Sequence, residues 1–116
     1  MTAGEGVSLV DGDSFCTSRA SGDLVGGTDG LYVAGRRVLS RCALAVNGQA
    51  VVPVGCHLDD PAAATFVARA GHPSGGPGPI VVRRRFLGEG MRDDVELRNP
   101  GDEATYVEVE VALAAD

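Results

Sequence analysis

Arg41-Cys42-Ala43-Leu44-Ala45-Val46, followed at once by Asn47-Gly48, decides the fold class of this chain. Cys42, Leu44 and Val46 alternate with Arg41 and two alanines, and a period of two is typical of a strand with one buried face. Asn-Gly is the strongest short signal for a two-residue β-hairpin. We therefore expect an antiparallel hairpin whose returning strand runs from Gln49 to Val54.

Similar patterns occur on both sides of this hairpin. Short apolar or alternating runs bounded by Gly, Pro, Asn and Asp predict strands at Val7–Val10, Ser14–Thr17, Leu31–Ala34, Thr65–Arg69, Ile80–Leu87, Met91–Arg98 and Thr105–Leu113. In the last run the apolar side chains Val107, Val109, Val111 and Leu113 alternate with Tyr106, Glu108, Glu110 and Ala112, which predicts a half-buried strand. Because two sheets packed face to face bury one side of each strand, we predict an all-β, two-layer antiparallel β-sandwich.

Gly and Pro mark where these strands should stop. Pro53 has no backbone donor, so we place it at the end or edge of a strand, and we expect the run Leu58–Pro61 to break the chain. Alanines in 62–70 favour a helix, but Thr65-Phe66-Val67 favours a strand, which we prefer. The segment 71–79 is rich in Gly and Pro, which predicts a mobile surface loop.

Length and composition indicate one domain over residues 1–116. A chain of 116 residues has room for one modest core, and 44% hydrophobic residues are sufficient to build it. The net charge of −6 disfavours nucleic acid and anionic membrane surfaces as partners, whereas neutral ligands such as glucans are unaffected. Residues 1–6 lack the features of a secretory signal and no apolar run is long enough to cross a bilayer, so we expect a cytoplasmic protein.

A search for reactive groups predicts no catalysis and no cofactor. Cys16, Cys42 and Cys56 lack metal-site spacing, and we interpret them as reduced thiols that act as small apolar core residues. His57 and His72 are expected at the surface, and adjacent Cys56 and His57 point to opposite sides of an extended chain. The acidic pairs Asp59-Asp60 and Asp93-Asp94 are interpreted as solvated surface groups rather than the opposed carboxyls of a glycosidase.

Several motifs resemble one known family. The run Asp29-Gly30-Leu31-Tyr32-Val33-Ala34-Gly35-Arg36-Arg37-Val38-Leu39-Ser40 is similar to the DGL(F/Y)-x-x-DTR-x-LS block in the N-terminal domain of bacterial glycogen debranching enzymes, the amylo-α-1,6-glucosidase family. Arg83–Met91 resembles the family's RxRF-x-G-x-G-(L/M) hairpin, and Val95–Asn99 resembles the strand after it. Glu108–Asp116 resembles the strand that continues into a DFxDxFE segment in relatives. The resemblance extends from Val7 to the last residue.

The resemblance implies an accessory domain. In the family this β-sandwich precedes a catalytic α-helical toroid, whose acidic residues hydrolyse α-1,6-glucosidic bonds, and the toroid is absent here. Because the chain stops at the first aspartate of the DFxDxFE segment, we expect it to be truncated at the C-terminus. Residues expected at a substrate cleft or domain interface are Asp29, Tyr32, Arg37, Arg83 and Arg85. The family's Asp-Thr-Arg falls on Gly35-Arg36-Arg37, so a charge partner of the loop is lost.

Arg83-Arg84-Arg85 permits two interpretations. In the first, the arginines form cross-strand ion pairs with Asp93, Asp94 and Glu96. In the second, Arg83 and Arg85 anchor the missing domain through bidentate contacts. Both remain open from the sequence.

Two functions follow. The first is a non-catalytic module that packs against its own catalytic domain, shapes the entrance for α-glucan, and in isolation exposes an apolar patch that favours self-association. The alternative is a free-standing β-sandwich that binds a protein or small ligand through loop 71–79, unrelated to glycans.

Overall fold

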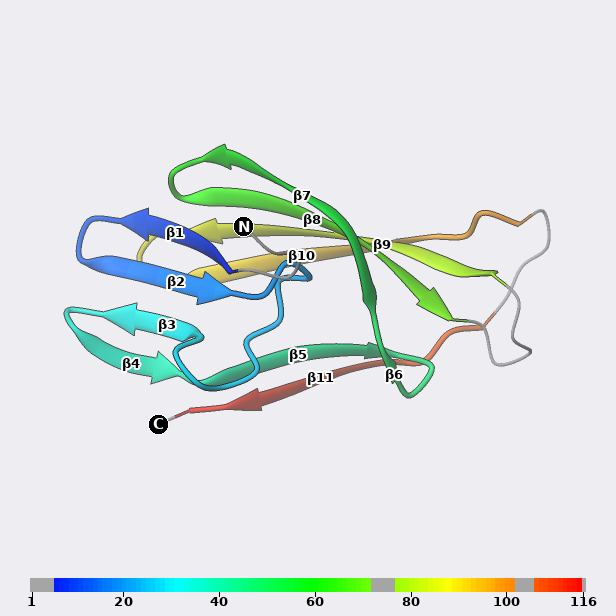
Figure 1. Ribbon diagram of the computed structural model, residues 1–116, viewed down its shortest axis with the longest axis horizontal. Helices are drawn as coiled ribbons and strands as arrows, with labels where there is room; N and C mark the ends of the chain where they lie inside the picture. Colours follow the sequence, from blue (N-terminus) through cyan, green and yellow to red (C-terminus); the bar gives the residue numbers. More distant parts are fainter. Residues whose placement is uncertain (1–5, 72–76, 102–105, 116) are drawn as a thin grey trace.

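The computed structural model describes residues 6–71, 77–101 and 106–115, and these form eleven strands and no helix (Figure 1). The strands are β1 (Val7–Asp11), β2 (Ser14–Ser18), β3 (Gly30–Val33), β4 (Arg36–Leu39), β5 (Arg41–Val46), β6 (Gln49–Ala50), β7 (Val52–Asp60), β8 (Ala63–Gly71), β9 (Pro77–Leu87), β10 (Met91–Arg98) and β11 (Val109–Ala114). All pairings between neighbouring strands are antiparallel. The predicted all-β class is confirmed.

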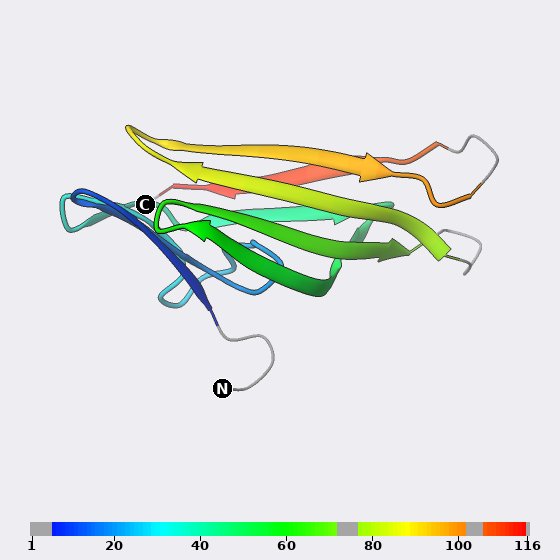
Figure 2. The same ribbon diagram turned by 90° about the horizontal axis from the view of Figure 1, so that it is seen from above.

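The strands form three sheets that build two layers. One layer is the sheet β10-β9-β8-β7, and the other contains the sheets β1-β2-β3-β4 and β11-β5-β6. The two sheets of the second layer are joined because β4 leads directly into β5 (Figure 1). Leu24, between β2 and β3, also forms an isolated bridge with Cys42 of β5. Figure 2 shows the β7–β10 sheet running along the length of the molecule. This architecture is consistent with the predicted β-sandwich.

Two clusters of buried side chains lie between the layers. In the first, Leu9, Cys16 and Leu31 from β1–β3 pack with Phe66 of β8 and Leu87 of β9. The second holds the buried side chains of β5, β8 and β9 together with Val51: Leu44, Val46, Val51, Ala68, Ala70 and Val81. Burial of apolar surface between the layers is therefore what holds the two sheets of the second layer against the first.

The predicted Asn-Gly turn is confirmed, but its returning strand is shorter than the predicted Gln49–Val54: β6 ends at Ala50, and Val52–Val54 belong to β7, which pairs with β8. Asn47 and Gly48 have φ values of 54° and 77°, as a two-residue turn with two left-handed positions requires. A second hairpin of the same kind was not predicted: Ala34 and Gly35, with φ of 52° and 78°, join β3 to β4, so the strand predicted over Leu31–Ala34 ends at Val33. Ala34 carries no turn signal in the sequence, since alanine rarely adopts positive φ.

Four sequence predictions are corrected by the structure. Leu58, Asp59 and Asp60 continue β7 instead of breaking the chain, because the register shifts beside them absorb the irregularity. Gly71 belongs to β8 and residues 77–79 begin β9, so the loop expected over 71–79 is shorter; residues 72–76 lie outside the described residues. The final strand begins at Val109 instead of Thr105, which lies outside the described residues; it lies at a sheet edge, and both of its faces are exposed where one buried face was predicted. Cys56 is exposed, unlike Cys16 and Cys42.

Candidate functional site

The outer face of the β1–β4 sheet carries a row of large side chains. Val10, Phe15, Tyr32 and Arg37 are successive cross-strand neighbours on β1, β2, β3 and β4. They point away from the core, since the alternate residues Leu9, Cys16 and Leu31 are buried. Val10 is 52% exposed and Phe15 38% exposed, so apolar surface is left open to solvent. We call these four residues the outer-face row.

The two aromatic rings of the row are stacked. The centroids of Phe15 and Tyr32 are 4.5 Å apart and their planes differ by 8°. Adjacent strands are themselves about 4.8 Å apart, so each ring covers one face of its neighbour. The pair therefore offers a rigid apolar ridge, and only part of its ring surface is free for the flat stacking that a sugar ring prefers.

Asp29 is buried beside the row and holds the preceding loop in place. Its Oδ2 atom accepts hydrogen bonds from Arg19 Nε at 3.2 Å and from the Val25 amide at 3.3 Å. Arg37 donates to the backbone carbonyls of Gly27 and Asp29, at 2.9 and 3.4 Å. The loop thus fixes the guanidinium at one end of the outer-face row.

The structure brings three of the five predicted site residues together. The Tyr32 hydroxyl donates to the Thr28 carbonyl at 2.9 Å, in the same loop that Asp29 and Arg37 stabilise. Tyr32 and Arg37 are half-buried, and Asp29 is 7% exposed. Asp29 consequently stabilises the loop from its buried position, while Tyr32 and Arg37 contribute directly to the exposed face.

Arg83 and Arg85 lie elsewhere, inside the sandwich. They are 3% and 0% exposed, and both donate to Asp93 at 2.8 Å, Arg85 through two nitrogen atoms. Arg83 also donates to Asp23 at 2.8 Å. Arg84 faces the other side of β9 and lies 3.6 Å from Glu96. The cross-strand ion pairs predicted with Asp93 and Glu96 are therefore present, and Asp93 is not the solvated surface acid that the sequence suggested.

These four side chains form a compact group, which we call the ion cluster: Asp23, Arg83, Arg85 and Asp93. Two cations and two anions balance, as a low-dielectric interior requires. Burial alone would raise the pKa of Asp93, but hydrogen bonds and charge from Arg85, with Arg83, outweigh it and hold this pKa below its usual range. The arginine nitrogens are directed at groups of this chain, so the cluster stabilises the fold.

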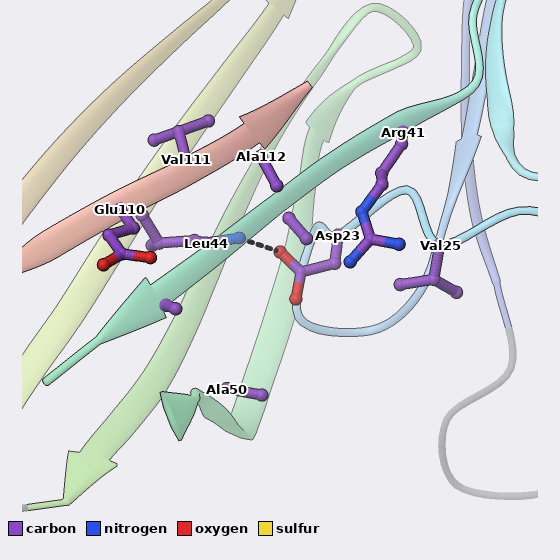
Figure 3. Close-up of a pocket in the computed structure, with 10 residues that line it drawn as sticks. Asp23, Val25, Arg41, Leu44, Ala50, Glu110, Val111 and Ala112 are labelled. Carbon is purple, nitrogen blue, oxygen red and sulfur yellow. Dashed lines mark hydrogen bonds between the residues drawn. The ribbon is translucent and has the colours of Figure 1, made fainter. Parts of the chain in front are cut away.

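Asp23 is a residue that the sequence did not single out. Its Oδ1 atom accepts a hydrogen bond from the Leu44 amide at 3.0 Å (Figure 3), and the same atom accepts from Arg83 Nη1 at 2.8 Å. β11 pairs with one side of β5, but on the other side β6 ends at Ala50, so the Leu44 amide, which points to that side, has no strand partner there and donates to the carboxylate instead. Charge balance is the signal that could have revealed Asp23. Two buried arginines need two acids, and β10 supplies only one of them, Asp93.

A cavity of about 380 Å³ lies at this interruption of the sheet. Alanines of β5 and β11 form part of its wall, and Asp23, Arg41 and Glu110 contribute charged groups, as Figure 3 shows. The cavity lacks the aromatic surface typical of sugar sites.

The comparisons with known proteins give one result. The family model for the N-terminal domain of (some) glycogen debranching enzymes matches residues 9–116. The chain belongs to this family. Neither curated proteins nor solved structures gave a match. The matched range includes the outer-face row, the Asp29 loop and the ion cluster.

The triplet Gly35-Arg36-Arg37 begins in the turn between β3 and β4. Gly35 is the second turn residue between β3 and β4, with φ of 78°. Glycine adopts this conformation without steric cost, and aspartate tolerates it better than most residues. The Ala34 amide donates to the Asp13 carbonyl at 3.0 Å, which ties the turn to the neighbouring hairpin. Arg37, two residues after Gly35, is anchored through the backbone carbonyls of Gly27 and Asp29.

Reactive side chains are dispersed in the part of the chain that the structure describes. Burial raises the pKa of the Cys16 and Cys42 thiols, which reduces their nucleophilicity. His57 is 77% exposed and lies 3.7 Å from Asp59; His72 lies outside the described residues. No group of three or more metal-binding side chains occurs in residues 6–71, 77–101 and 106–115. Over the same residues there is no helix long and apolar enough to cross a membrane.

Proposed function

We propose that this chain is a non-catalytic accessory domain of a glycogen debranching-type glucosidase, and that it packs against the catalytic domain through the outer-face row. The row would then form one side of the entrance through which α-glucan reaches the catalytic carboxylates. The family match supports the type of enzyme. The exposed row is the observation that carries the rest of the proposal.

The row has the properties of a docking surface. The solvent-exposed face of a sheet usually carries mostly polar side chains. Here, Val10, Phe15 and Tyr32 are adjacent to one another across three strands. Aromatic residues and arginine are enriched where proteins meet. The stacked rings are already ordered, so a partner that covers them loses little side-chain entropy.

The proposal includes a cytoplasmic location. Cys16, Cys42 and Cys56 are free, and an exposed free thiol such as Cys56 fits a reducing compartment. α-Glucan contact is a secondary part of the proposal, since one ring face of Tyr32 and the guanidinium of Arg37 border the same surface.

The test is reconstitution in trans. The chain would be mixed with the separately expressed catalytic domain of a glycogen debranching enzyme, and both complex formation and glucose release from a branched dextrin would be measured. We expect a complex that enhances activity, and amide chemical-shift changes centred on β1–β4. Phe15→Ser should weaken the complex by about tenfold or more, as for an interfacial aromatic residue.

Phe86→Ser is the matched control. Phe86 is similarly exposed, at 43%, but lies on the opposite layer in β9, so its replacement should leave the complex unchanged. A complex that tolerates Phe15→Ser, or no complex at all, would contradict the proposed role of the row. Shifts in β1–β4 upon addition of maltoheptaose alone would separately support contact with glucan.

A further inference from the structure

Strand β11 leaves a row of backbone groups unpaired. It is the last strand of the sheet β11-β5-β6, and among the described residues no strand pairs with its outer side. The Asn47 amide donates to the Glu108 carbonyl, so residues 108, 110, 112 and 114 direct their backbone groups toward β5. Val109, Val111 and Leu113 therefore direct their N–H and C=O groups outward.

The other sheet edges in the described part of the chain are protected. β7 contains Pro53 and two register shifts, and β6 has only two residues. The Val10 amide at the edge of β1 donates to the Pro61 carbonyl, and β4 is four residues long with two arginines. β10 carries five charged side chains: Arg92, Asp93, Asp94, Glu96 and Arg98. These are the devices by which proteins prevent edge-to-edge pairing.

β11 has none of these devices. It pairs with β5 in unbroken register, contains no proline and has one charged residue, Glu110. Val109, Val111 and Leu113 are 42%, 53% and 65% exposed, so apolar side chains lie beside the open backbone groups. A flat, apolar, unprotected edge is a template for a further strand.

We infer that β11 pairs with β11 of a second copy of this chain, antiparallel and centred on Val111. This register joins outward-facing residues only: Val111 with Val111, and Val109 with Leu113 of the second copy. Each of these pairs exchanges both backbone hydrogen bonds. Glu110 then lies opposite Ala112 of the second copy, whereas a shift to a centre at Glu110 would place two glutamates opposite each other.

The resulting dimer joins two three-stranded sheets into one continuous sheet. The apolar side chains of the two β11 strands lie along the same face of the seam and cover one another, which removes them from water. A twofold axis at Val111 makes the contact self-complementary, so association stops at the dimer. The inference uses a different surface from the outer-face row, so either proposal can fail without the other.

The test is the oligomeric state of the purified chain by sedimentation equilibrium, with amide hydrogen exchange at low and high protein concentration. We expect a concentration-dependent dimer in which the amides of Val109, Val111 and Leu113 become protected. Val111→Pro removes an outward donor while sparing the ladder to β5, and should weaken dimerisation by about tenfold or more. Val111→Lys should weaken it as well, through like-charge repulsion at the symmetry axis.

Val54→Lys is the matched control, because Val54 is an exposed valine of the edge strand β7, and this variant should dimerise normally. Ala112→Lys places a cation opposite Glu110 of the second copy and should tighten the dimer, whereas Ala112→Glu should weaken it. A chain that remains monomeric into the millimolar range overturns the inference. So does a dimer that persists in both folded Val111 variants, or a dimer whose protected amides lie elsewhere.

Discussion

Asp93 is the anion that the two buried arginines of this domain share. Its two carboxylate oxygens accept hydrogen bonds from Arg83 and Arg85, and no more than a few per cent of either arginine is exposed. An arginine cannot lose its charge in the interior as a lysine can. The anion must therefore be present wherever these two arginines are buried.

Replacing this anion should be severe. We expect Asp93→Asn to lower the free energy of unfolding by about 3–5 kcal/mol, because it leaves buried positive charge uncompensated. Urea denaturation followed by circular dichroism measures the effect. Asp94→Asn is the control: Asp94 pairs with exposed Arg92, and its replacement should change stability little. If both variants lowered the free energy of unfolding equally, the ion cluster would contribute no more to stability than an exposed ion pair.

Acid should weaken the same contact. The pKa of Asp93 is held below its usual range, so its contribution to stability is present above the unfolded pKa of about 4 and is lost as pH falls through the folded pKa. NMR titration of the carboxyl carbon should give a midpoint below that of an ordinary aspartate, with unfolding at the acid end of the curve. A midpoint at or above about 4 would contradict the arrangement of charges described here.

Ala34 is a residue in an unfavourable conformation. Its φ of 52° is left-handed, and the Asn47-Gly48 turn shows which residue suits the equivalent position. Ala34→Asn should raise stability by about 0.5–1 kcal/mol, measured by thermal unfolding. Asn47→Ala is the reverse experiment and should cost at least as much, because Asn47 also donates to Gly71 and accepts from the Glu108 amide. A destabilised Ala34→Asn variant would argue against this turn.

Residue patterns predicted part of the site and missed part of it. Alternation in β9 correctly placed Arg83 and Arg85 on one face, and the acids on the next strand correctly supplied partners. Alternation does not tell which face is buried, so both interpretations of the arginines stayed open. Asp23 was missed because it is 60 residues from Arg83 in sequence and lies in a turn, where acids are usually solvated.

At the scale of elements, the sequence predicted most strands but misjudged their ends. Pro77-Gly78-Pro79 was assigned to a loop because proline cannot donate to a ladder, yet it opens β9. The structure explains this with Gly78, whose backbone lies against the carbonyl oxygens of Ala70 and Gly71 in β8. Glycine here allows two strands to approach each other closely. From the local sequence alone, a glycine in this role cannot be distinguished from a glycine in a flexible loop.

Gly78→Ala tests this explanation. An added methyl group would overlap with the carbonyl oxygens of Ala70 and Gly71, so we expect a loss of about 1–3 kcal/mol and faster hydrogen exchange at the end of β8. Gly88→Ala serves as the control, because its added methyl would meet no atom within 4 Å. Equal stability of both variants would mean that β9 does not begin at Pro77.

Whether a strand is buried depends on the strands beside it, and local periodicity alone did not predict which strands are buried here. β11 alternates as clearly as β5, but β5 lies inside its sheet while β11 lies at the edge. Leu44 is consequently 3% exposed, and its cross-strand partner Val111 is 53% exposed. The strand order, which depends on pairings distant in sequence, decides which alternating run is covered.

At the scale of the whole molecule, the two layers enclose two thiols and leave a third outside. Cys16 and Cys42 belong to the first core cluster, which joins β1–β3 and β5 to β8 and β9, whereas Cys56 lies on the edge strand β7. Either buried thiol can be reached only if the layers separate. The rates at which Cys16 and Cys42 react therefore report whether the two layers separate in one cooperative step.

We expect the exposed Cys56 thiol to react rapidly with an aromatic disulfide reagent in the native state, and the buried Cys16 and Cys42 thiols to react only on unfolding. Burial holds the pKa values of Cys16 and Cys42 above their usual range, so both remain protonated thiols while the layers are closed, and the slow phase should follow global unfolding. Asp93→Asn should accelerate both slow thiols together, since the ion cluster contacts both: Arg83 donates to the sulfur of Cys42 and Arg85 to that of Cys16. Peptide mapping identifies each labelled residue. Rapid labelling of all three, or acceleration of only one, would mean that the layers do not open as a single unit.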